Sequence, residues 1–115
     1  MKARFEIKRT ANDKFMFNLK AANDLIILTS QMYATKENAE DGIASVRQNA
    51  ALDERYEKKV GTDGKPYFVL HAANRLVIGR SETYSSPEAM QKGIASVKRN
   101  GPKAETVDLS MHARA

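Results

Sequence analysis

Histidine, tyrosine and carboxylate side chains are the groups in this chain that could support catalysis or ligand binding. The chain has two histidines, His71 and His112, and no cysteine. Nucleophilic catalysis needs a base beside the nucleophile, but we expect His71 at an outward strand position and His112 in a frayed C-terminal tail. A chain without cysteine has no disulfide, thiol nucleophile or thiolate metal site.

Four carboxylates could in principle pair for acid and base work. Glu37 and Glu88 follow predicted helix starts, where the helix dipole favours negative charge. Glu6 and Glu57 take outward positions on predicted strands. The sequence also has no cluster with metal-ligand spacing and neither a P-loop nor a GxGxxG turn. We therefore predict no catalytic residue, no cofactor and no metal site, and we expect that the protein is not an enzyme.

Tyr33 and Tyr84 occupy matching places between a predicted strand and a predicted helix, and Ser30 and Ser81 precede them. A tyrosine at such a place can plug the end of the core while its hydroxyl bonds to the backbone. It can also form the rim of a ligand site that is present twice. The sequence leaves both interpretations open.

The composition is that of an ordered globular protein able to position such groups. Of the 115 residues, 42% are hydrophobic and 29% are charged, which is too apolar for a disordered chain. The apolar run Leu25 to Leu28 is far shorter than the roughly 20 residues of a membrane span. The alternating start "MKARFEIKR" lacks the unbroken apolar stretch of a signal peptide. We therefore expect a cytoplasmic protein without membrane contact.

An internal duplication organises the chain. A shift of 51 positions aligns residues 4–50 with 55–101 without a gap, and 20 of these 47 positions are identical. A third, partial copy begins at Thr106, because "RFE", "RYE" and "TVD" recur at the same shift. Each unit thus ends with the kind of strand that begins the next. The middle strand, at residues 54–60, follows the first predicted helix and precedes the second hairpin, so it can belong to both halves.

Each unit predicts three strands followed by a helix. The first two strands are joined by "TANDK" or "GTDGK", which are hairpin signals. The next loop contains "AAN", and we predict three residues in it, Ala22 to Asp24, because Leu25 and Ile27 then share a face with Phe17 and Leu19. This loop requires a left-handed residue at Asp24 and at its counterpart Arg75.

Helices are predicted after Thr35 and Ser86, which are natural N-caps. The repeated "GIASV" places Gly42 and Gly93 in mid-helix, where glycine is worse than alanine by about 0.5–1 kcal/mol. We predict that these glycines allow a close backbone approach, either of helix to sheet or of helix to helix.

A nucleic-acid site is the alternative to a protein or small-ligand site. The net charge is +5, which favours contact with polyanions. An exposed sheet can stack bases if basic groups follow the phosphates, and the candidates are Tyr67, His71, Lys20 and Lys14. The positions Met16 and Asn18 in the other half supply no second aromatic group, so the signal is weak.

The two stretches "FNLKAANDLIILTSQMYATKENAEDGIASVRQNA" and "FVLHAANRLVIGRSETYSSPEAMQKGIASVKRNG" resemble the tandem copies of the YegP-like family of small, mostly bacterial proteins. The resemblance runs from about Arg4 to Leu109 and rests on the AAN, SxxY and GIxSV blocks in fixed order. It implies that the two copies share one sheet and exchange their last strands. It also implies a fused dimer with an internal twofold, so we expect a monomer. The family is one of unknown function and carries over no binding residue.

These inferences predict an α+β fold of two tandem β-β-β-α-β repeats that share one mainly antiparallel sheet, with exchanged C-terminal strands and two helices packed on it. The predicted single domain spans residues 1–109, with repeats at about 1–54 and 55–109, a linking strand at 54–60 and a disordered tail at 110–115. The predicted function is that of a non-enzymatic binding or interaction module with pseudo-twofold symmetry. Its partner is unknown, whether a protein or a small ligand, and a nucleic-acid-associated protein is the alternative.

Overall fold

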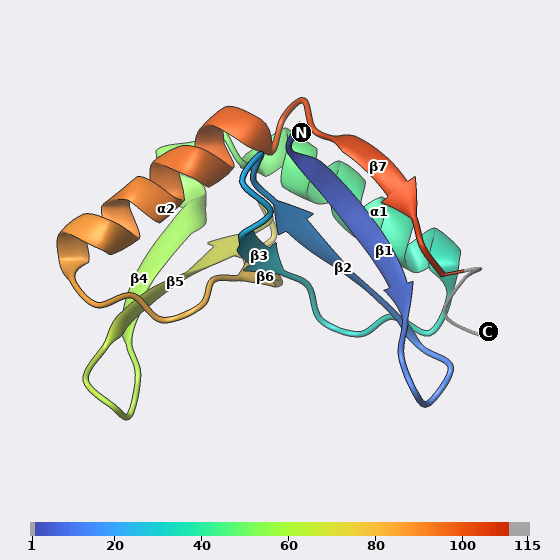
Figure 1. The fold of residues 1–115 in the computed structure, drawn as a ribbon, viewed down its shortest axis with the longest axis horizontal. Coiled ribbons are helices and arrows are strands. Elements are labelled where there is room, and N and C mark those ends of the chain that lie inside the picture. Colours follow the sequence, from blue (N-terminus) through green and yellow to red (C-terminus); the bar gives the residue numbers. More distant parts are fainter. Residues whose placement is uncertain (1, 111–115) are drawn as a thin grey trace.

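One twisted seven-stranded sheet carries two helices on the same side, in a computed structural model that describes residues 2–110 (Figure 1). The elements are β1 (Arg4–Arg9), β2 (Phe15–Lys20), β3 (Ile26–Thr29), α1 (Lys36–Asn49), the short 3₁₀ helix η1 (Asp53–Arg55), β4 (Tyr56–Val60), β5 (Pro66–His71), β6 (Val77–Arg80), α2 (Pro87–Asn100) and β7 (Glu105–Asp108). The strand order is β4-β5-β6-β3-β2-β1-β7. The predicted α+β fold is confirmed.

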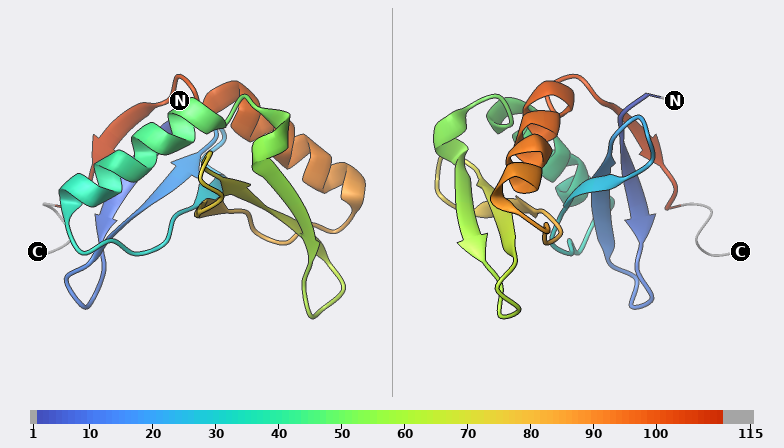
Figure 2. Two further views of the ribbon diagram at one scale, coloured as in Figure 1. Left: turned by 180° about the vertical axis from the view of Figure 1, so that it is seen from behind. Right: turned by 60° about the vertical axis from the view of Figure 1, so that its left-hand side comes forward.

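The sheet has an internal pseudo-twofold axis between β3 and β6. β1 pairs with β2 in the same register that β4 has with β5, so Ile7 faces Phe17 as Lys58 faces Phe68. The view from behind repeats the outline of the front view, with one helix over each half of an arched sheet (Figure 2). The last strand of the second repeat, β7, crosses to the first half and pairs in parallel with β1. This is the predicted exchange of strands.

The helices begin where the sequence predicts. The side chain of Thr35 accepts a hydrogen bond from the Asn38 backbone N–H at 3.0 Å, and that of Ser86 accepts one from the Ala89 N–H at 3.1 Å. These caps satisfy donors that the first helical turn leaves free. Neither helix within residues 2–110 has the length and apolar character that crossing a membrane requires.

The loops between β2 and β3 and between β5 and β6 turn through the three predicted residues, because backbone hydrogen bonds from Ala21 to Leu25 and from Ala72 to Leu76 close them on either side. Asp24 and Arg75 are left-handed, with φ of 70° and 71°. The prediction for the following strand was partly wrong. Leu25 does not share the buried face, because it is 62% exposed. The register shifts by one residue between Leu19 and Lys20, so that Leu28 lies opposite Leu19.

The mid-helix glycines make room for tyrosine rings and not, as predicted, for a second backbone. A Cβ atom added at Gly42 would lie 2.9 Å from Cζ of Tyr33, and one at Gly93 would lie 2.6 Å from Cζ of Tyr84. Real Cβ atoms do not approach so closely, and interiors give way little. The cost of glycine in each helix is thus offset by the packing of a tyrosine.

Each tyrosine ring is stacked on a buried phenylalanine. The Tyr33 and Phe17 centroids are 6.2 Å apart with an interplanar angle of 9°, and Tyr84 and Phe68 match them at 6.2 Å and 12°. In the part of the chain that the structure describes, each ring packs closely over a glycine, and neither hydroxyl makes the hydrogen bond to the backbone that the plug interpretation allowed for. Burial raises the pKa of both hydroxyls. These positions support the interpretation of the tyrosines as structural plugs of the core.

The pseudo-twofold symmetry fails at its own axis. β3 and β6 meet there through Thr29 and Arg80. Leu28 and Gly79 are equivalent by the repeat, yet the Leu28 side chain fills the space over Gly79, where an added Cβ would lie 2.5 Å from it. A single leucine side chain therefore fills a space that two leucines would overfill.

The C-terminal end of the described chain is fixed to β7. Ser110 is 1% exposed, and its hydroxyl donates a hydrogen bond to Oδ1 of Asp108 at 2.6 Å. The predicted disordered tail begins at this residue, but its remainder, residues 111–115 with His112, lies outside the described residues.

Candidate binding site at the uncovered edge of the sheet

The pseudo-twofold creates four outer strand positions, whereas the chain has three segments to fill them. Each half has a place like that of β1 and, outside it, a place like that of β7. The segment that follows α1 becomes β4, which pairs with β5 as β1 pairs with β2. The same residues cannot also lie outside β4. Within residues 2–110, the outer side of β4, which we call the β4 edge, therefore has no neighbouring strand.

The corresponding edge of β1 is held firmly by β7. The backbone N–H of Leu109 donates to the Ile7 carbonyl at 2.8 Å. From α1, the Arg47 guanidinium donates to the Ala104 carbonyl at 2.8 Å and to Oγ1 of Thr106 at 2.9 Å. These contacts define how a strand at this type of position is bound. The side chain of Ile7 is itself completely buried in the core.

The β4 edge has a different surface. Lys58 stands where the first half has the buried Ile7, and Lys58, Lys59 and Val60 are all exposed. Lysines on an edge strand discourage indiscriminate pairing with other chains. Because β4 and β1 have the same register with their inner neighbours, the carbonyl of Lys58 corresponds to the Ile7 carbonyl that accepts from β7. The backbone groups of the β4 edge are thus turned toward solvent.

Tyr56 anchors the start of β4 to the first repeat. Its hydroxyl donates a hydrogen bond to the Ala50 carbonyl at 2.6 Å, and its ring meets that of Phe68 at 5.7 Å and 60°. Burial, together with the nearby charge of Asp53, raises the pKa of this hydroxyl. Asp53 in turn forms an ion pair with Lys98 of α2. Position 98 is equivalent to Arg47, so the two helices hold the chain at matching points.

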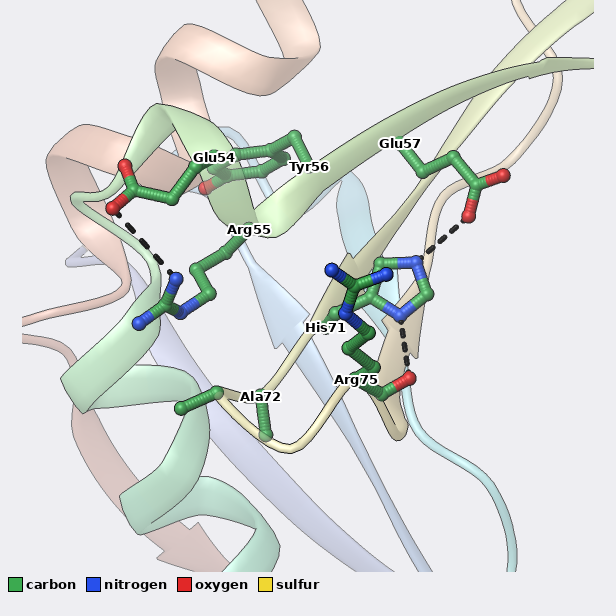
Figure 3. Close-up of a pocket in the computed structure, with 8 residues that line it drawn as sticks. Glu54, Arg55, Tyr56, Glu57, His71, Ala72 and Arg75 are labelled. Carbon is green, nitrogen blue, oxygen red and sulfur yellow. Dashed lines mark hydrogen bonds and ion pairs between the residues drawn. The ribbon is translucent and has the colours of Figure 1, made fainter.

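A cavity of about 570 Å³ lies beside the first half of β4 (Figure 3). Its lining residues are Glu54, Arg55, Tyr56, Glu57, His71, Ala72, Ala73 and Arg75. The His71 ring spans the cavity wall, with Nε2 2.8 Å from Oε1 of Glu57 and Nδ1 3.0 Å from the Arg75 carbonyl. Both partners are acceptors, so the two bonds form together only when both ring nitrogens carry protons.

Two guanidinium groups frame the same cavity (Figure 3). Arg55 donates through Nε to Oδ1 of Asn49 at 2.8 Å, and its Nη1 lies 3.7 Å from Glu54. Arg75 enters from the loop between β5 and β6. The cavity therefore presents two planar cations, which suit recognition of a carboxylate or another oxyanion.

The equivalent place in the first half is closed by ion pairs. Glu6 lies 3.0 Å from Nε of Arg4 and 3.2 Å from Nζ of Lys20, and Arg4 also pairs with Asp24. Burial alone would raise the pKa of Glu6, but the hydrogen bonds from Lys20 and Arg4 outweigh it and hold the pKa below its usual value. In the second half, Arg75 replaces Asp24 and cannot pair with Arg55. The charge reversal leaves the cavity open.

The nucleic-acid candidates do not form a common surface. Tyr67 has the guanidinium of Arg80 over its ring, 4.8 Å from the centroid. Lys20 is engaged by Glu6, and His71 by Glu57. Lys14 lies in the turn after β1. The structure thus brings together His71 and the two arginines, and leaves the other candidates apart.

Sequence reasoning missed the β4 edge and its cavity. The signal was present in the third partial copy of the repeat, since residues 54–60 match both the strand that begins a unit and the strand that ends one. A comparison of the four outer strand positions with the three copies of the strand segment would have shown that one outer position is unfilled.

Comparison with known proteins finds one family model, described as a domain of unknown function (DUF1508), that matches twice, at residues 11–57 and 62–108. A UPF0339 protein YegP of Yersinia pestis is 52% identical over 107 residues, covering 93% of this chain and 96% of that protein. UPF0339 protein YegP of Escherichia coli K12 is 48% identical over 104 residues, covering 90% and 94%.

Two solved structures have the same fold. The solution NMR structure of UPF0339 protein SO3888 from Shewanella oneidensis matches with a TM-score of 0.90 and 44% identity, covering 96% of this chain and 94% of that one. The solution NMR structure of yegP from E. coli, described as a protein of unknown function, matches with a TM-score of 0.90 and 46% identity, covering 96% and 95%. None of these descriptions indicates a catalytic role.

Proposed function

Because this chain belongs to the DUF1508 family, which is described as a domain of unknown function, we propose its function from its geometry: it is a non-enzymatic module that binds an extended segment of another protein along the β4 edge. The observation that carries this proposal is a difference between two equivalent strands, β1 and β4. β7 covers β1, and no strand within residues 2–110 covers β4. A segment that adds to the sheet would complete the symmetry of the fold.

Strand addition suits the chemistry of this edge. Main-chain hydrogen bonds supply affinity in such complexes, and alternate side chains supply specificity. The carbonyl of Lys58 corresponds to one that already accepts a hydrogen bond from β7 in the first half. The cavity beside Arg55 and Glu57 provides room for a side chain of the added segment.

We propose that the protein acts as a monomer. A second copy that paired its β4 in an antiparallel manner about Lys58 would set this lysine against its own equivalent, and like charges directly opposite one another destabilise a strand pair. The pseudo-twofold arrangement already joins two repeats in one sheet.

A peptide from the chain itself tests the proposal. The probe is the octapeptide KAETVDLS, identical to residues 103–110, which include β7. Added to the uniformly ¹⁵N-labelled protein, it is expected to shift the amide resonances of Tyr56, Lys58 and Val60 in a saturable way. The amides of β1 should not respond, because β7 already covers that strand.

A matched pair of modified peptides serves as the control. N-methylation at the leucine equivalent to Leu109 removes the N–H that would reach the Lys58 carbonyl, and binding should be lost. N-methylation at the aspartate equivalent to Asp108 should leave binding intact, because successive N–H groups of a strand point to opposite sides. If millimolar peptide leaves the β4 amides unmoved, the proposal is wrong.

The nucleic-acid alternative is settled by a separate titration with mixed-sequence single- and double-stranded nucleic acid at low and moderate salt. Micromolar binding that weakens steeply with salt would support it. No binding at low salt would remove it.

A further inference from the structure

We infer that the segment accepted by the β4 edge runs parallel to β4 and is acidic, with one carboxylate beside Arg55 and a second, three residues later, beside Lys58. This inference rests on the proposed strand addition and specifies the polarity and charge of the partner. It follows from three observations on the covered and the uncovered edge.

The first observation is the register of the covered edge. β7 runs parallel to β1, with Glu105 opposite Arg4 and Asp108 opposite Ile7. Applying the repeat, a segment in the same place beside β4 has its first residue level with Arg55, which ends η1 directly before the strand, and its fourth opposite Lys58. The antiparallel direction has no counterpart at the β1 edge.

The second observation is the charge that each position meets. In the first half the fourth position lies beside the apolar Ile7, and Asp108 turns instead to Lys36 of α1, 2.9 Å away. In the second half that position meets Lys58 itself, and Lys58 forms no ion pair within residues 2–110. The position of Lys36 is taken by Pro87, so the counter-charge has moved from the helix to the strand.

The third observation is the open cavity at the first position. Arg55 and its counterpart in the first half, Arg4, are both arginines. Only Arg4 has an aspartate from the neighbouring loop, Asp24, as its partner. Arg75 stands in that loop position in the second half and lines the cavity with Arg55. A carboxylate at the first position of the segment would lie between the two guanidinium groups and replace the missing aspartate.

Other charges near the edge do not cancel this preference. Glu57 is engaged by His71, at 2.8 Å, and approached by Lys59 at 3.9 Å. Glu54 faces Arg55 at the longer distance of 3.7 Å. Lys58, at the fourth position, thus has no ion-pair partner within residues 2–110, and Arg55, at the first, has only the distant carboxylate of Glu54. The chain's own β7, with sequence ETVD, already has acidic residues at both.

Peptides that differ only in charge test the inference. The core ETVD of the octapeptide is compared with QTVN, with the two single changes, and with KTVK, by NMR titration at low salt. Each change of carboxylate to amide is expected to weaken binding about 2- to 5-fold, the range for exposed ion pairs, and KTVK should bind more weakly still. The variant Lys58→Glu should reverse the preference at the fourth position alone.

A spin label at either end of the peptide reports its direction. A label at the amino end should broaden the resonances of Ala72 and Arg75, and one at the carboxyl end should broaden those of the turn at Gly61 and Gly64. The opposite pattern would overturn the parallel polarity. Equal binding of ETVD and QTVN would overturn the charge preference, while the strand addition itself would stand.

Two outcomes separate failure of this inference from failure of the proposed function. If no peptide moves the amides of β4, both are wrong. If the protein alone forms a concentration-dependent dimer, and the amides of β4 change with dimerisation, the β4 edge belongs to a second copy and not to an acidic partner.

Discussion

The two outer strands β1 and β4 have the same register with their inner neighbours and opposite relations to solvent. β1 has Ile7 fully buried in the core, whereas β4 has Lys58 exposed at the same position. A covered strand can use an apolar residue, and an uncovered one needs a charge to avoid aggregation. The difference shows that the two repeats have diverged according to which edge received the third copy of the strand.

Fusion of the repeats explains why such divergence is possible. In a symmetric dimer of one repeat, any residue near the axis would meet its own copy. In this chain Leu28 meets Gly79 instead, and Asp24 of the first half has become Arg75 in the second. The asymmetry at the axis improves packing, while the asymmetry at the edge opens a charged cavity.

Exchange of the residues at the two edges should have the largest effect. Ile7→Lys places an ammonium group in a site that is 0% exposed, and we expect a loss of about 4 kcal/mol or more in the free energy of unfolding, from lost apolar burial and an unpaired charge. Lys58→Ile should change that free energy by about 0.5 kcal/mol or less. Urea denaturation measures both.

Lys58→Ile should also promote self-association, because it removes the charge that protects the edge. Sedimentation velocity over a range of concentrations measures this. Similar losses of stability in Ile7→Lys and Lys58→Ile would mean that the two positions are equally buried. That result would contradict the difference between the β1 and β4 edges.

The packing at the axis is tested by a second exchange. Leu28→Gly leaves a void, Gly79→Leu overfills the same space, and each should cost about 2–4 kcal/mol. The double variant restores one leucine and one glycine in reversed places, and it should recover most of the loss. Thermal and urea unfolding of all three variants measure the coupling between the sites. Strictly additive losses would show that the two residues do not share one space.

The sequence was sufficient to predict most of the fold. The repeat shift located the strands and helices of both halves, and capping residues such as Thr35 and Ser86 placed the helix starts. The left-handed Asp24 and Arg75 were predicted correctly, although the argument for them also placed Leu25 on the buried face, where it does not lie. These features depend on local chemistry and on a period, both of which can be seen in a linear chain.

The remaining features depend on contacts between distant segments. The bulge that exposes Leu25 arises within the pairing of β2 with β3. The fit of Gly42 against Tyr33 requires the position of a loop over a helix, so the sequence indicated a close approach but not its partner. The candidate site was missed because it is an absence of pairing, which no single residue marks and which emerges only when the strand positions are counted against the repeated segments.

Alanine in place of the helix glycines compares the two halves in their cores. Each change gains about 1 kcal/mol of helix propensity but drives a Cβ into a tyrosine ring, so we expect net losses of about 1–2 kcal/mol. Gly93→Ala should cost more than Gly42→Ala, since the distance to Cζ is 2.6 Å against 2.9 Å. Tyr84→Phe should partly rescue Gly93→Ala, as removal of the oxygen lets the ring retreat. Calorimetry gives the ranking, and a stabilised Gly93→Ala would refute the packing argument.

Acid unfolding offers a smaller effect that belongs to the covered edge alone. The hydrogen bonds from Lys36 and Ser110 lower the pKa of Asp108 to about 2. Because this pKa is depressed in the folded protein, the ionised form stabilises the fold above about pH 4, and the contribution is lost as the pH falls toward 2. The Asp108 side chain is 35% exposed, so solvent screening limits the contribution to about 1 kcal/mol or less.

Asp108→Asn should therefore lower the free energy of unfolding at pH 6 by this small amount and flatten its dependence on pH between about 4 and 2. Lys36→Gln should weaken the same interaction from the other side. Glu105→Gln is the matched control, because it removes a carboxylate from the same strand that forms no ion pair within residues 2–110. Urea midpoints measured at several pH values give these slopes. If Glu105→Gln flattens the pH dependence as much as Asp108→Asn does, the acid sensitivity reflects the net charge of β7. The ion pair between Lys36 of α1 and Asp108 would then not be its cause.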